Sequence, residues 1–409
     1  MTLLLFLLTL SILVLVHELG HFLMAKKSGV LVEEFGFGLP PRIWGKKIGE
    51  TIYSINALPI GGFVKLFGEE GLPSPTPSAG LRRGEGRAFF EKTKRARLGV
   101  ILAGVVMNFL LAVIVFSVIY FVMGIPVKTS EIKIVGIAKG SPADSVGLKI
   151  EDKILSLDGQ RFENIENFVN ATKEKAGKVI KLEINREKDN PCKDQKILGG
   201  GVGPPSPRLW RDFGEAKPGF EVSCQNGNLL ISVVPRVKPP EGEGPLGVAI
   251  SEMEMKYYPW WLMPFYGIRE GFKESVVWGK MVFESLISMF KNLIFLRQIP
   301  KEVAGPIGIY QATGMVAKSG ILAILEFLGI LSVNLAIINV LPFPALDGGR
   351  LVFLGIEVFF GRKIAPKVEA WINNLGMAIL LFLLLLVTIN DIARILTTNH
   401  ILEKIKVIF

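Results

Sequence analysis

The strongest chemical signal in the sequence is the segment 17-HELGH-21 near its N-terminus. On a helix, His17 and His21 project from the same face, because residues four apart lie one above the other. Two neutral imidazoles at this spacing can bind one zinc ion, and Glu18 lies close enough to accept a proton from a zinc-bound water. The segment therefore predicts a zinc-dependent hydrolase in which His17 and His21 are metal ligands and Glu18 is the general base.

The third zinc ligand is expected in the segment 339-NVLPFPALDGGR-350, because a catalytic zinc needs three protein ligands and one open position. The carboxylate of this segment is Asp347. Pro342 and Pro344 cannot continue a helix, so the chain is expected to unwind there, and the two glycines after Asp347 are expected to leave its backbone free to bend toward the metal. The remaining histidine, His400, lies in the C-terminal tail. An ordinary turn with a capping aspartate is the alternative interpretation of this segment.

Four apolar segments are long enough to cross a bilayer about 30 Å thick. They lie within residues 1–25, 98–123, 320–349 and 371–396, and the third range also contains the Asp347 segment, which follows the apolar run. Half of all residues are hydrophobic and only 21% are charged, which excludes a disordered chain. A cleaved signal peptide is the alternative for the first segment, but the basic start and small-residue cleavage site of such peptides are missing. The sequence thus predicts a polytopic α-helical membrane protein with four transmembrane helices.

The formal net charge of +10 is distributed in a way that orients these helices. Basic residues gather in the loop 67–97, which ends in Lys92, Lys94, Arg95 and Arg97 directly before the second apolar segment. Loops rich in Lys and Arg face the cytoplasm. We therefore expect this loop to be cytoplasmic, the chain between the second and third helices to lie outside, and the bilayer rather than nucleic acid to be the partner of the basic charge.

The segment 257–297 is predicted to be an amphipathic helix region in the membrane interface rather than a fifth span. At about 100° per residue, its polar side chains fall on one helical face and its apolar side chains on the other. The polar face contains Lys280, Glu284, Ser288 and Lys291. Tyrosine and tryptophan residues cluster at the beginning of the segment, as is typical of rings at the level of lipid headgroups.

Residues 130–250 have the composition of a water-exposed domain. Short β-like runs alternate there with glycine and asparagine turns, which predicts a β-rich fold. Within it, residues 188–228 are rich in glycine and proline and are interpreted as an inserted loop. This loop contains both cysteines of the chain, Cys192 and Cys224. In an oxidising exterior they can form a disulfide, and two unpaired thiols are the alternative.

Part of this outer domain resembles a PDZ domain of the kind attached to proteases. The resemblance lies in 136-GIAKGSPADSVGLKIEDKILSLDGQ-160, where SPA, GL, D-x-I and a D-G turn follow at the usual spacing. Glu151 stands where a glycine is usual. Gly244 to Val248 resembles the carboxylate-binding loop of such domains in permuted order. A PDZ-like domain here implies binding of a peptide C-terminus or exclusion of substrates with large outer domains, and an unrelated β-domain is the alternative.

Taken together, the motifs resemble the site-2 protease family, the intramembrane zinc metalloproteases, and its bacterial branch with PDZ domains. HELGH in the first apolar segment, N-x-x-P-x-P-x-L-D-G-G after the third and the PDZ-like domain between them follow the family order. The segment 305-GPIGI-309 also matches. Residues 31–66, with FGFG, P-x-x-W, T-x-Y and P-x-GG-x-V-K, resemble the membrane-dipping β-hairpin of that family.

The resemblance implies hydrolysis of a peptide bond within transmembrane segments of other proteins, for example an anti-sigma factor or a remnant signal peptide. It implies that His17, His21 and Asp347 bind Zn²⁺ and that Glu18 is the general base. Asn339 and Asn334 would then hydrogen-bond the substrate backbone or the developing oxyanion. The hairpin 31–66 would either pair with an unwound substrate or shield the site, and the membrane would be the inner membrane of a bacterium.

Two other classes of function remain open from the sequence. A non-enzymatic membrane adaptor would use the PDZ-like domain to bind peptides, but such a module has no need of a general base such as Glu18. A metal transporter would also place histidines and carboxylates in the membrane. A transporter is expected to spread polar groups along several spans, whereas here they gather at the two segments that contain His17 and Asp347.

Overall fold

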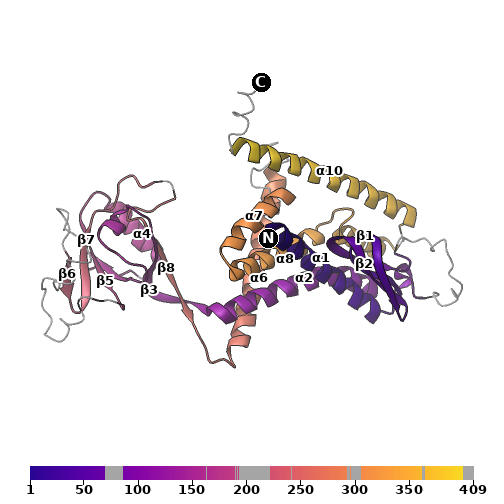
Figure 1. Ribbon diagram of the computed structural model, residues 1–409, viewed down its shortest axis with the longest axis horizontal. Helices are drawn as coiled ribbons and strands as arrows, with labels where there is room; N and C mark the ends of the chain where they lie inside the picture. The colour runs from indigo at the N-terminus through magenta and orange to yellow at the C-terminus, as the bar shows by residue number, and fades with distance from the viewer. Residues whose placement is uncertain are drawn as a thin grey trace, which may run out of the picture. The chain divides into compact units, whose positions relative to one another are not determined.

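The computed structural model describes residues 1–69, 86–162, 164–188, 190, 192, 222–240, 242–292, 295, 305–361 and 364–398 (Figure 1). The chain forms two compact units, one made of Met1–Met123 with Pro259–Phe409 and the other of Gly124–Tyr258. Most of the predicted basic loop, most of the predicted inserted loop and His400 lie outside the described residues.

Four helices of the first unit, within the described part of the chain, are long and apolar enough to cross a membrane. They are α1 (Thr2–Lys27), α2 (Lys94–Met123), α8 (Ile321–Val340) and, within α10 (Pro366–Thr398), residues Val368–Ala393. This agrees with the four predicted spans. The third helix ends at Val340, and Leu341 to Leu346 form a turn before a new helix, α9 (Asp347–Phe360), which agrees with the interruption predicted from Pro342 and Pro344.

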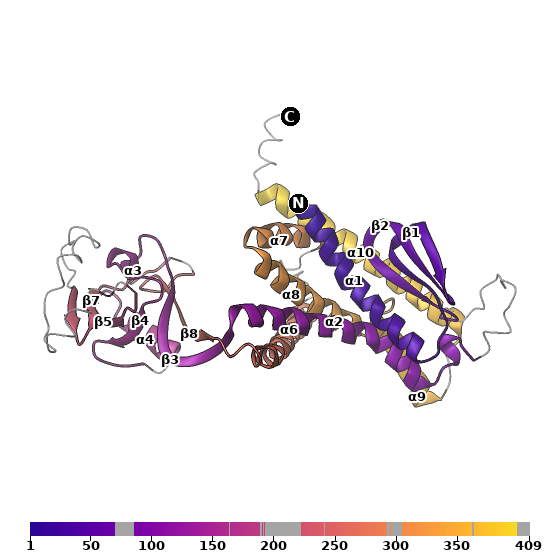
Figure 2. The ribbon, with the colours of Figure 1, turned by 60° about the horizontal axis from the view of Figure 1, so that its bottom comes forward.

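Helices α1, α2 and α8 pack side by side and bury a shared apolar core (Figure 2). The crossing of α1 and α2 is close at Gly20, where an added Cβ would lie 2.3 Å from the carbonyl oxygen of Ala103. Gly329 of α8 similarly faces the ring of Phe116 on α2, 2.9 Å from the position of its missing Cβ. The glycine inside HELGH is therefore needed for helix packing, since no side chain fits between these backbones.

The turn between α8 and α9 corrects one expectation about the glycines that follow Asp347. A Cβ on Gly348 would lie 2.0 Å from the carbonyl oxygen of Leu341, and one on Gly349 would lie 2.5 Å from that of Phe343. Both glycines are buried in the first turn of α9. They hold the turn tightly against the start of α9 rather than leave the backbone free to bend.

Helix α6 (Met263–Lys291) lies within the predicted amphipathic region 257–297. It packs along α2, where Cβ atoms on Gly267 and Gly271 would lie 3.0 and 2.5 Å from atoms of Ser117. Helix α6 is not among the four helices apolar enough to span a membrane. The next described helix is α7 (Pro306–Lys318), which begins within the GPIGI segment.

A long antiparallel hairpin follows α1. Its strands are β1 (Val32–Ile48) and β2 (Thr51–Leu66), which lie within one residue of the predicted range 31–66. The hairpin contacts α1, and Phe35 packs against Phe22 of that helix with ring centroids 5.0 Å apart. The one-turn 3-10 helix η2 (Phe89–Glu91) precedes α2. The hairpin is thus fixed to the helix that carries HELGH.

The second unit is built on a six-stranded antiparallel sheet with strand order β6-β7-β5-β4-β3-β8. The strands are β3 (Ile125–Ile137), β4 (Lys153–Leu157), β5 (Ile180–Asn185), β6 (Val222–Gln225), β7 (Asn228–Val233) and β8 (Val248–Lys256). Two helices, α3 (Pro142–Ser145) and α4 (Ile165–Glu174), accompany the sheet. Phe168 of α4 is fully buried against alternate residues of the strands, as expected for a half-exposed sheet.

Glu151 has a backbone conformation that is unusual for a residue with a side chain. Its φ angle is 79°, in the left-handed region that favours glycine. The neighbouring Asp152 is buried and accepts two hydrogen bonds from Arg186, at 2.7 Å from Nε and 2.6 Å from Nη2. This bidentate pair fixes the residue that follows Glu151, which helps to hold the turn in place.

The predicted inserted loop 188–228 extends too far toward the C-terminus, because strand β6 lies inside the predicted range. Asn226 and Gly227 form the turn between β6 and β7 with φ angles of 52° and 79°. This is the Asn-Gly signal of a two-residue hairpin, which requires positive φ at both positions. The sequence therefore contained the information that the loop ends before Val222.

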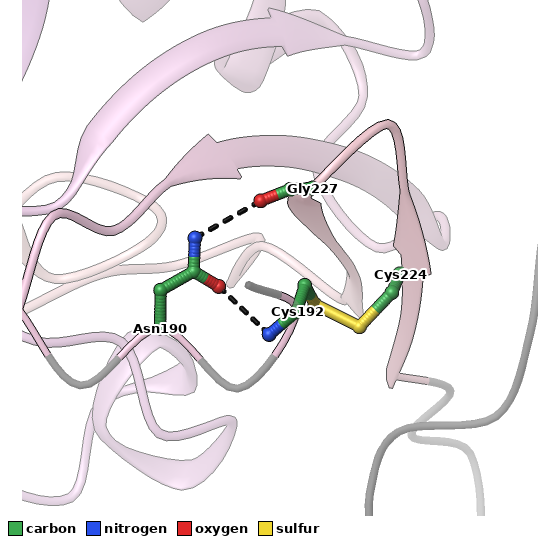
Figure 3. Close-up of a disulfide and its surroundings, with 4 residues drawn as sticks. All are labelled: Asn190, Cys192, Cys224 and Gly227. Carbon is green, nitrogen blue, oxygen red and sulfur yellow. Dashed lines mark hydrogen bonds between the residues drawn. A yellow bond between two sulfur atoms is a disulfide. The ribbon is translucent and has the colours of Figure 1, made fainter. Parts of the chain in front are cut away.

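Cys192 and Cys224 form a disulfide between the start of this loop and β6 (Figure 3). Asn190 holds the bridge in place: its Oδ1 accepts from the Cys192 backbone N–H at 2.9 Å and its Nδ2 donates to the Gly227 carbonyl at 2.9 Å (Figure 3). Both cysteines are buried in the core of the second unit. Of the two alternatives for these cysteines, the structure has the disulfide.

We expect the double change Cys192→Ser and Cys224→Ser to destabilise the second unit by about 3 to 4 kcal/mol, because the bridge closes a loop with a sequence separation of 32 residues. The measurement is the urea midpoint of protease sensitivity of the second unit in the full-length, detergent-solubilised chain. Ser223→Ala, next to Cys224 on β6, is the control and should leave the midpoint unchanged. An equal midpoint for the double variant and the control would contradict the prediction.

Candidate active site

Three potential metal ligands meet between α1 and α9, although 326 positions separate His21 from Asp347. The Asp347 Oδ2 atom lies 3.1 Å from the Nε2 of His17 and 3.2 Å from the Nε2 of His21. The two Nε2 atoms are 3.1 Å apart. Both histidines are buried, and the aspartate side chain is 16% exposed. The ligand set predicted from the sequence is therefore brought together in space.

The geometry of these three atoms fits a zinc ion. Asp347 Oδ2 is a buried oxygen without a hydrogen-bond partner among the described residues, although two ring nitrogens face it. Ligand atoms about 2.0 to 2.1 Å from a tetrahedral zinc lie about 3.3 Å from one another. The observed separations of 3.1 to 3.2 Å are close to this value. A cation among the three atoms would satisfy the otherwise unpartnered carboxylate oxygen.

The far side of each imidazole faces a polar group of α2. His21 Nδ1 lies 2.8 Å from the carbonyl oxygen of Val100. Because a carbonyl only accepts hydrogen bonds, His21 Nδ1 carries the proton and Nε2 carries the lone pair. His17 Nδ1 lies 3.3 Å from the side-chain nitrogen of Asn108, which is fully buried.

Glu18 faces the same site and is held by the hairpin. The backbone N–H of Val64 in β2 donates to Glu18 Oε2 at 3.0 Å. This bond occupies Oε2, one of the two carboxylate oxygens of Glu18. Glu18 and the three candidate ligands line one cavity of about 370 Å³. The carboxylate is thus oriented beside the ligand set by a strand distant in sequence from the helix that carries it.

The cavity combines polar groups at the ligand site with an apolar surround. It is lined by Val14, His17, Glu18, His21, Phe63, Val64, Leu66, Glu69, Phe89, Val100, Ile101, Leu335, Asn339, Ala345, Leu346, Asp347 and Arg350. The lining comes from α1, β2, η2, α2, α8 and α9 together with the loops that follow β2 and α8. A cavity in which a few convergent polar groups lie among apolar side chains is typical of an active site.

The chain was also compared with known proteins. The model of a protein family described as "Peptidase family M50" matches residues 5–383. The chain belongs to peptidase family M50. The Clostridium perfringens protein named "Putative zinc metalloprotease CPE1693" is 31% identical over 94% of this chain and 97% of its own length. The zinc metalloprotease RasP of Geobacillus kaustophilus and the regulator of sigma-W protease RasP of Bacillus subtilis are each 28% identical, over 95% and 96% of this chain and 97% and 99% of their own lengths.

Membership of the M50 family confirms the predicted resemblance to site-2 proteases. The M50 peptidase is an integral membrane zinc metalloprotease that acts on membrane proteins, and Zn²⁺ is its cofactor. The two other classes that the sequence left open, a non-enzymatic adaptor and a metal transporter, are not its function.

The two asparagines predicted at the site of the M50 peptidase differ in position. Asn339 lines the cavity and is the second-last residue of α8. Asn334 does not line it, because five residues on a helix correspond to a rotation of about 140° from Asn339. The structure therefore brings Asn339, but not Asn334, to His17, Glu18 and Asp347.

Two charged residues of the site were missed by the sequence analysis. Glu69 and Arg350 line the cavity and form an ion pair that connects the segment after β2 to α9. Glu69 Oε2 also accepts from the Leu66 backbone N–H at 3.3 Å. Arg350 follows the LDGG motif directly, which was an available signal. Glu69 had none, because it lies in a polar segment with no helical or strand periodicity.

Gly104 of α2 leaves the space in which the two histidines of the M50 peptidase lie. A Cβ at this position would be 2.4 Å from His21 Nε2 and 2.8 Å from His17 Nε2. We expect Gly104→Ala to weaken zinc binding at least about tenfold, because the methyl group displaces the ligand atoms themselves. The measurement is zinc affinity by competition with a chelator.

The matched control for this prediction is Gly99→Ala, on the same helix. Its Cβ would meet the terminal methyl group of Met24 at 2.6 Å, and a flexible side-chain end can move away. Zinc affinity of this control should equal that of the wild type. If Gly104→Ala also bound zinc as tightly as the wild type, the histidines would not occupy the positions seen here during metal binding.

Proposed function

We propose that His17, His21 and Asp347 hold the zinc of this protease and that Glu18 is its general base. The observation that carries the proposal is the meeting of three ligand atoms at 3.1 to 3.2 Å with Glu18 in the same cavity. The substrate is a peptide bond within a transmembrane segment of another membrane protein. The relative from Bacillus subtilis is named for regulation of sigma-W. By analogy, a single-span regulator or a remnant signal peptide is the proposed substrate class.

The roles of the side chains follow from their positions. Zinc, when bound, lowers the pKa of a coordinated water to about 7 and polarises a carbonyl group. Glu18 accepts the proton of the attacking water at Oε1, because Val64 already holds Oε2. The protonated Glu18 then donates to the nitrogen of the leaving amine. Asn339 is placed at the cavity to donate its amide N–H to the substrate carbonyl oxygen, whereas Asn334 is given no role.

The hairpin provides a means to present the substrate. A helical substrate hides its carbonyl groups in i to i−4 hydrogen bonds and must unwind before attack. Strand β2 lies beside Glu18, and an extended substrate segment can pair with a strand in this position. Dipping of the hairpin 31–66 into the membrane is part of the same proposal. Shielding of the site from water is the second role that the cavity-lining Phe63 and Leu66 support.

The proposed orientation places the loop 67–97 in the cytoplasm and the unit Gly124–Tyr258 outside, in the inner membrane of a bacterium. The disulfide between Cys192 and Cys224 supports an oxidising exterior for that unit. Directly before α6, Trp260 and Trp261 are 78% and 57% exposed. Exposed tryptophans beside an amphipathic helix support the proposed interfacial location of the segment 257–297.

The outer unit is proposed to be a PDZ-like domain. Strand β8 is the last strand of its sheet, and α4 lies beside it. A groove between an edge strand and a helix can take an extended peptide by strand addition. The turn before β8 includes Gly247, whose φ angle of 70° is typical of a loop that presents backbone N–H groups to a carboxylate. The domain either binds a newly formed peptide C-terminus or excludes substrates with large outer domains.

The test is cleavage of a single-span protein tagged at both ends and reconstituted with the purified enzyme in liposomes. We expect a cut inside the span, located by mass spectrometry, which stops after zinc is removed by a chelator and resumes when zinc is restored. Cleavage only in the loops of the substrate would contradict the proposed substrate class. Cleavage that persists after complete zinc removal would contradict the role of the metal.

A further inference from the structure

Three residues of α2 form a stripe beneath the two histidines. Val100, Gly104 and Asn108 are spaced four residues apart, so they lie on one face of the helix. Val100 offers its carbonyl to His21 Nδ1 at 2.8 Å, Gly104 provides space, and Asn108 faces His17 Nδ1 at 3.3 Å. These three contacts to the side of the histidines that faces away from Asp347 therefore all come from α2. Helix α2 itself carries no proposed metal ligand.

We propose that Asn108 is the positioning residue of His17: its amide oxygen accepts a hydrogen bond from His17 Nδ1–H and so keeps Nε2 free for zinc. This inference rests on the proposed ligand set. It gives His17 the same arrangement that the Val100 carbonyl gives His21. Asn108 acts through His17 and has no contact of its own with substrate.

The proton on His17 decides the orientation of the Asn108 amide. Nε2 of His17 points at Asp347 Oδ2 and can bind a metal only through its lone pair. The proton of the neutral ring is then on Nδ1, and the group facing Nδ1 has to be an acceptor. The amide nitrogen is a donor only, so the amide oxygen is the partner that chemistry allows.

The observed amide has its nitrogen toward His17, and its oxygen is buried without a hydrogen-bond partner among the described residues. A half-turn about the Cβ–Cγ direction exchanges oxygen and nitrogen with almost no change in shape, and such assignments depend on the hydrogen-bond network. The exchange leaves the amide nitrogen, instead of the oxygen, without a hydrogen-bond partner among the described residues. The number of satisfied atoms is therefore equal in the two orientations and does not distinguish them. The requirement for a proton on His17 Nδ1 does distinguish them, because it needs the amide oxygen of Asn108 as its acceptor.

The surroundings of Asn108 make this hydrogen bond effective. The residue is fully buried between the helices, and its backbone carbonyl accepts from Ser332 Oγ of α8 at 2.7 Å. Water does not compete for a buried amide, and groups behind a metal ligand fix its ring orientation. An alternative role, a purely structural link between α2 and α8, would use the Ser332 bond and leave zinc binding unaffected.

The experiment compares zinc affinities of full-length variants by chelator competition in detergent. Asn108→Leu removes the acceptor at similar size, and we expect about 10- to 100-fold weaker zinc binding. Asn108→Asp retains an oxygen toward His17, and we expect affinity close to that of the wild type. With Co²⁺ in place of zinc, the visible spectrum of Asn108→Leu should differ from that of the wild type, and the spectrum of Asn108→Asp should match it. Asn108→Ala gives the same comparison if the leucine variant does not fold.

Two controls separate the possible causes of failure. Ser332→Ala removes the other hydrogen bond of Asn108 without touching the histidine, and its zinc affinity should be unchanged. His17→Ala tests the proposed ligand set itself. If His17→Ala lost zinc while Asn108→Leu and Asn108→Ala bound it like the wild type, only the role of Asn108 would be overturned. If His17→Ala also bound zinc normally, the proposed ligand set would fall.

Discussion

Replacing Glu18 with glutamine is expected to reduce cleavage of a transmembrane substrate by about 10²- to 10⁴-fold, the usual contribution of a general acid–base group. Glutamine has nearly the same shape but cannot take a proton from the attacking water. Its side-chain oxygen can still accept from the Val64 backbone N–H, so the hairpin should remain in place. Because Glu18 is not a proposed ligand, the zinc content should remain one ion per chain.

The measurement is the rate of substrate loss in liposomes, with zinc determined on the same preparation. Glu69→Gln is the matched control, since Glu69 is a second carboxylate of the same cavity that is paired with Arg350. We expect a much smaller loss of activity for this control. Equal losses for the two variants would remove the special role of Glu18, and full activity of Glu18→Gln would remove it from the mechanism.

Asp347→Asn is expected to lower zinc affinity by more than about 100-fold, beyond the range typical of residues that only support a ligand. The change removes the negative charge that faces both Nε2 atoms at 3.1 and 3.2 Å. It keeps the size of the side chain, so the turn before α9 and the close packing of Gly348 should survive. Activity should fall with zinc occupancy.

The control for Asp347 is Asp391→Asn. Asp391 is also buried in the first unit. Its Oδ2 accepts a hydrogen bond at 2.9 Å from the backbone N–H of Gly308, which lies at the start of α7. We expect this variant to lose stability and keep its zinc affinity, as measured by chelator competition. A normal zinc affinity of Asp347→Asn would assign the third ligand to another residue.

The sequence was sufficient for the parts of the site that depend on local geometry. His17 and His21 share a helical face whatever surrounds the helix, so their pairing followed from spacing alone. Pro342 and Pro344 correctly indicated an interruption before Asp347. The expected freedom of the following glycines was wrong, because a glycine can serve flexibility or close packing and only the structure distinguishes them.

The supporting contacts could not be predicted in the same way. The Val64 bond to Glu18 and the Glu69–Arg350 pair join segments distant in the chain, and no periodic pattern indicates such pairings. Asn108 did provide a signal, since a lone amide in an apolar span is costly and often functional. Asn334 provided a similar signal and lies away from the cavity. Polarity in a span therefore suggested candidates without identifying the right one.

The fold showed the same division between local and distant information. The four spans were found because long apolar runs are a local pattern, whereas the hairpin was expected only from the family resemblance of residues 31–66. The end of the inserted loop was missed although Asn226 and Gly227 signalled a hairpin turn. The sequence did not decide between a disulfide and two free thiols, because it does not give the distance between Cys192 and Cys224. That distance depends on the positions of Asn190 and β6 in the fold.

X-ray absorption fine structure at the zinc edge of the purified wild-type protein tests the ligand set most directly. The account predicts one zinc with two imidazole nitrogens and the remaining ligands oxygen, all at about 2.0 to 2.1 Å. A spectrum with three imidazoles or with a sulfur ligand would contradict it, because His17, His21 and Asp347 supply only two rings and one carboxylate.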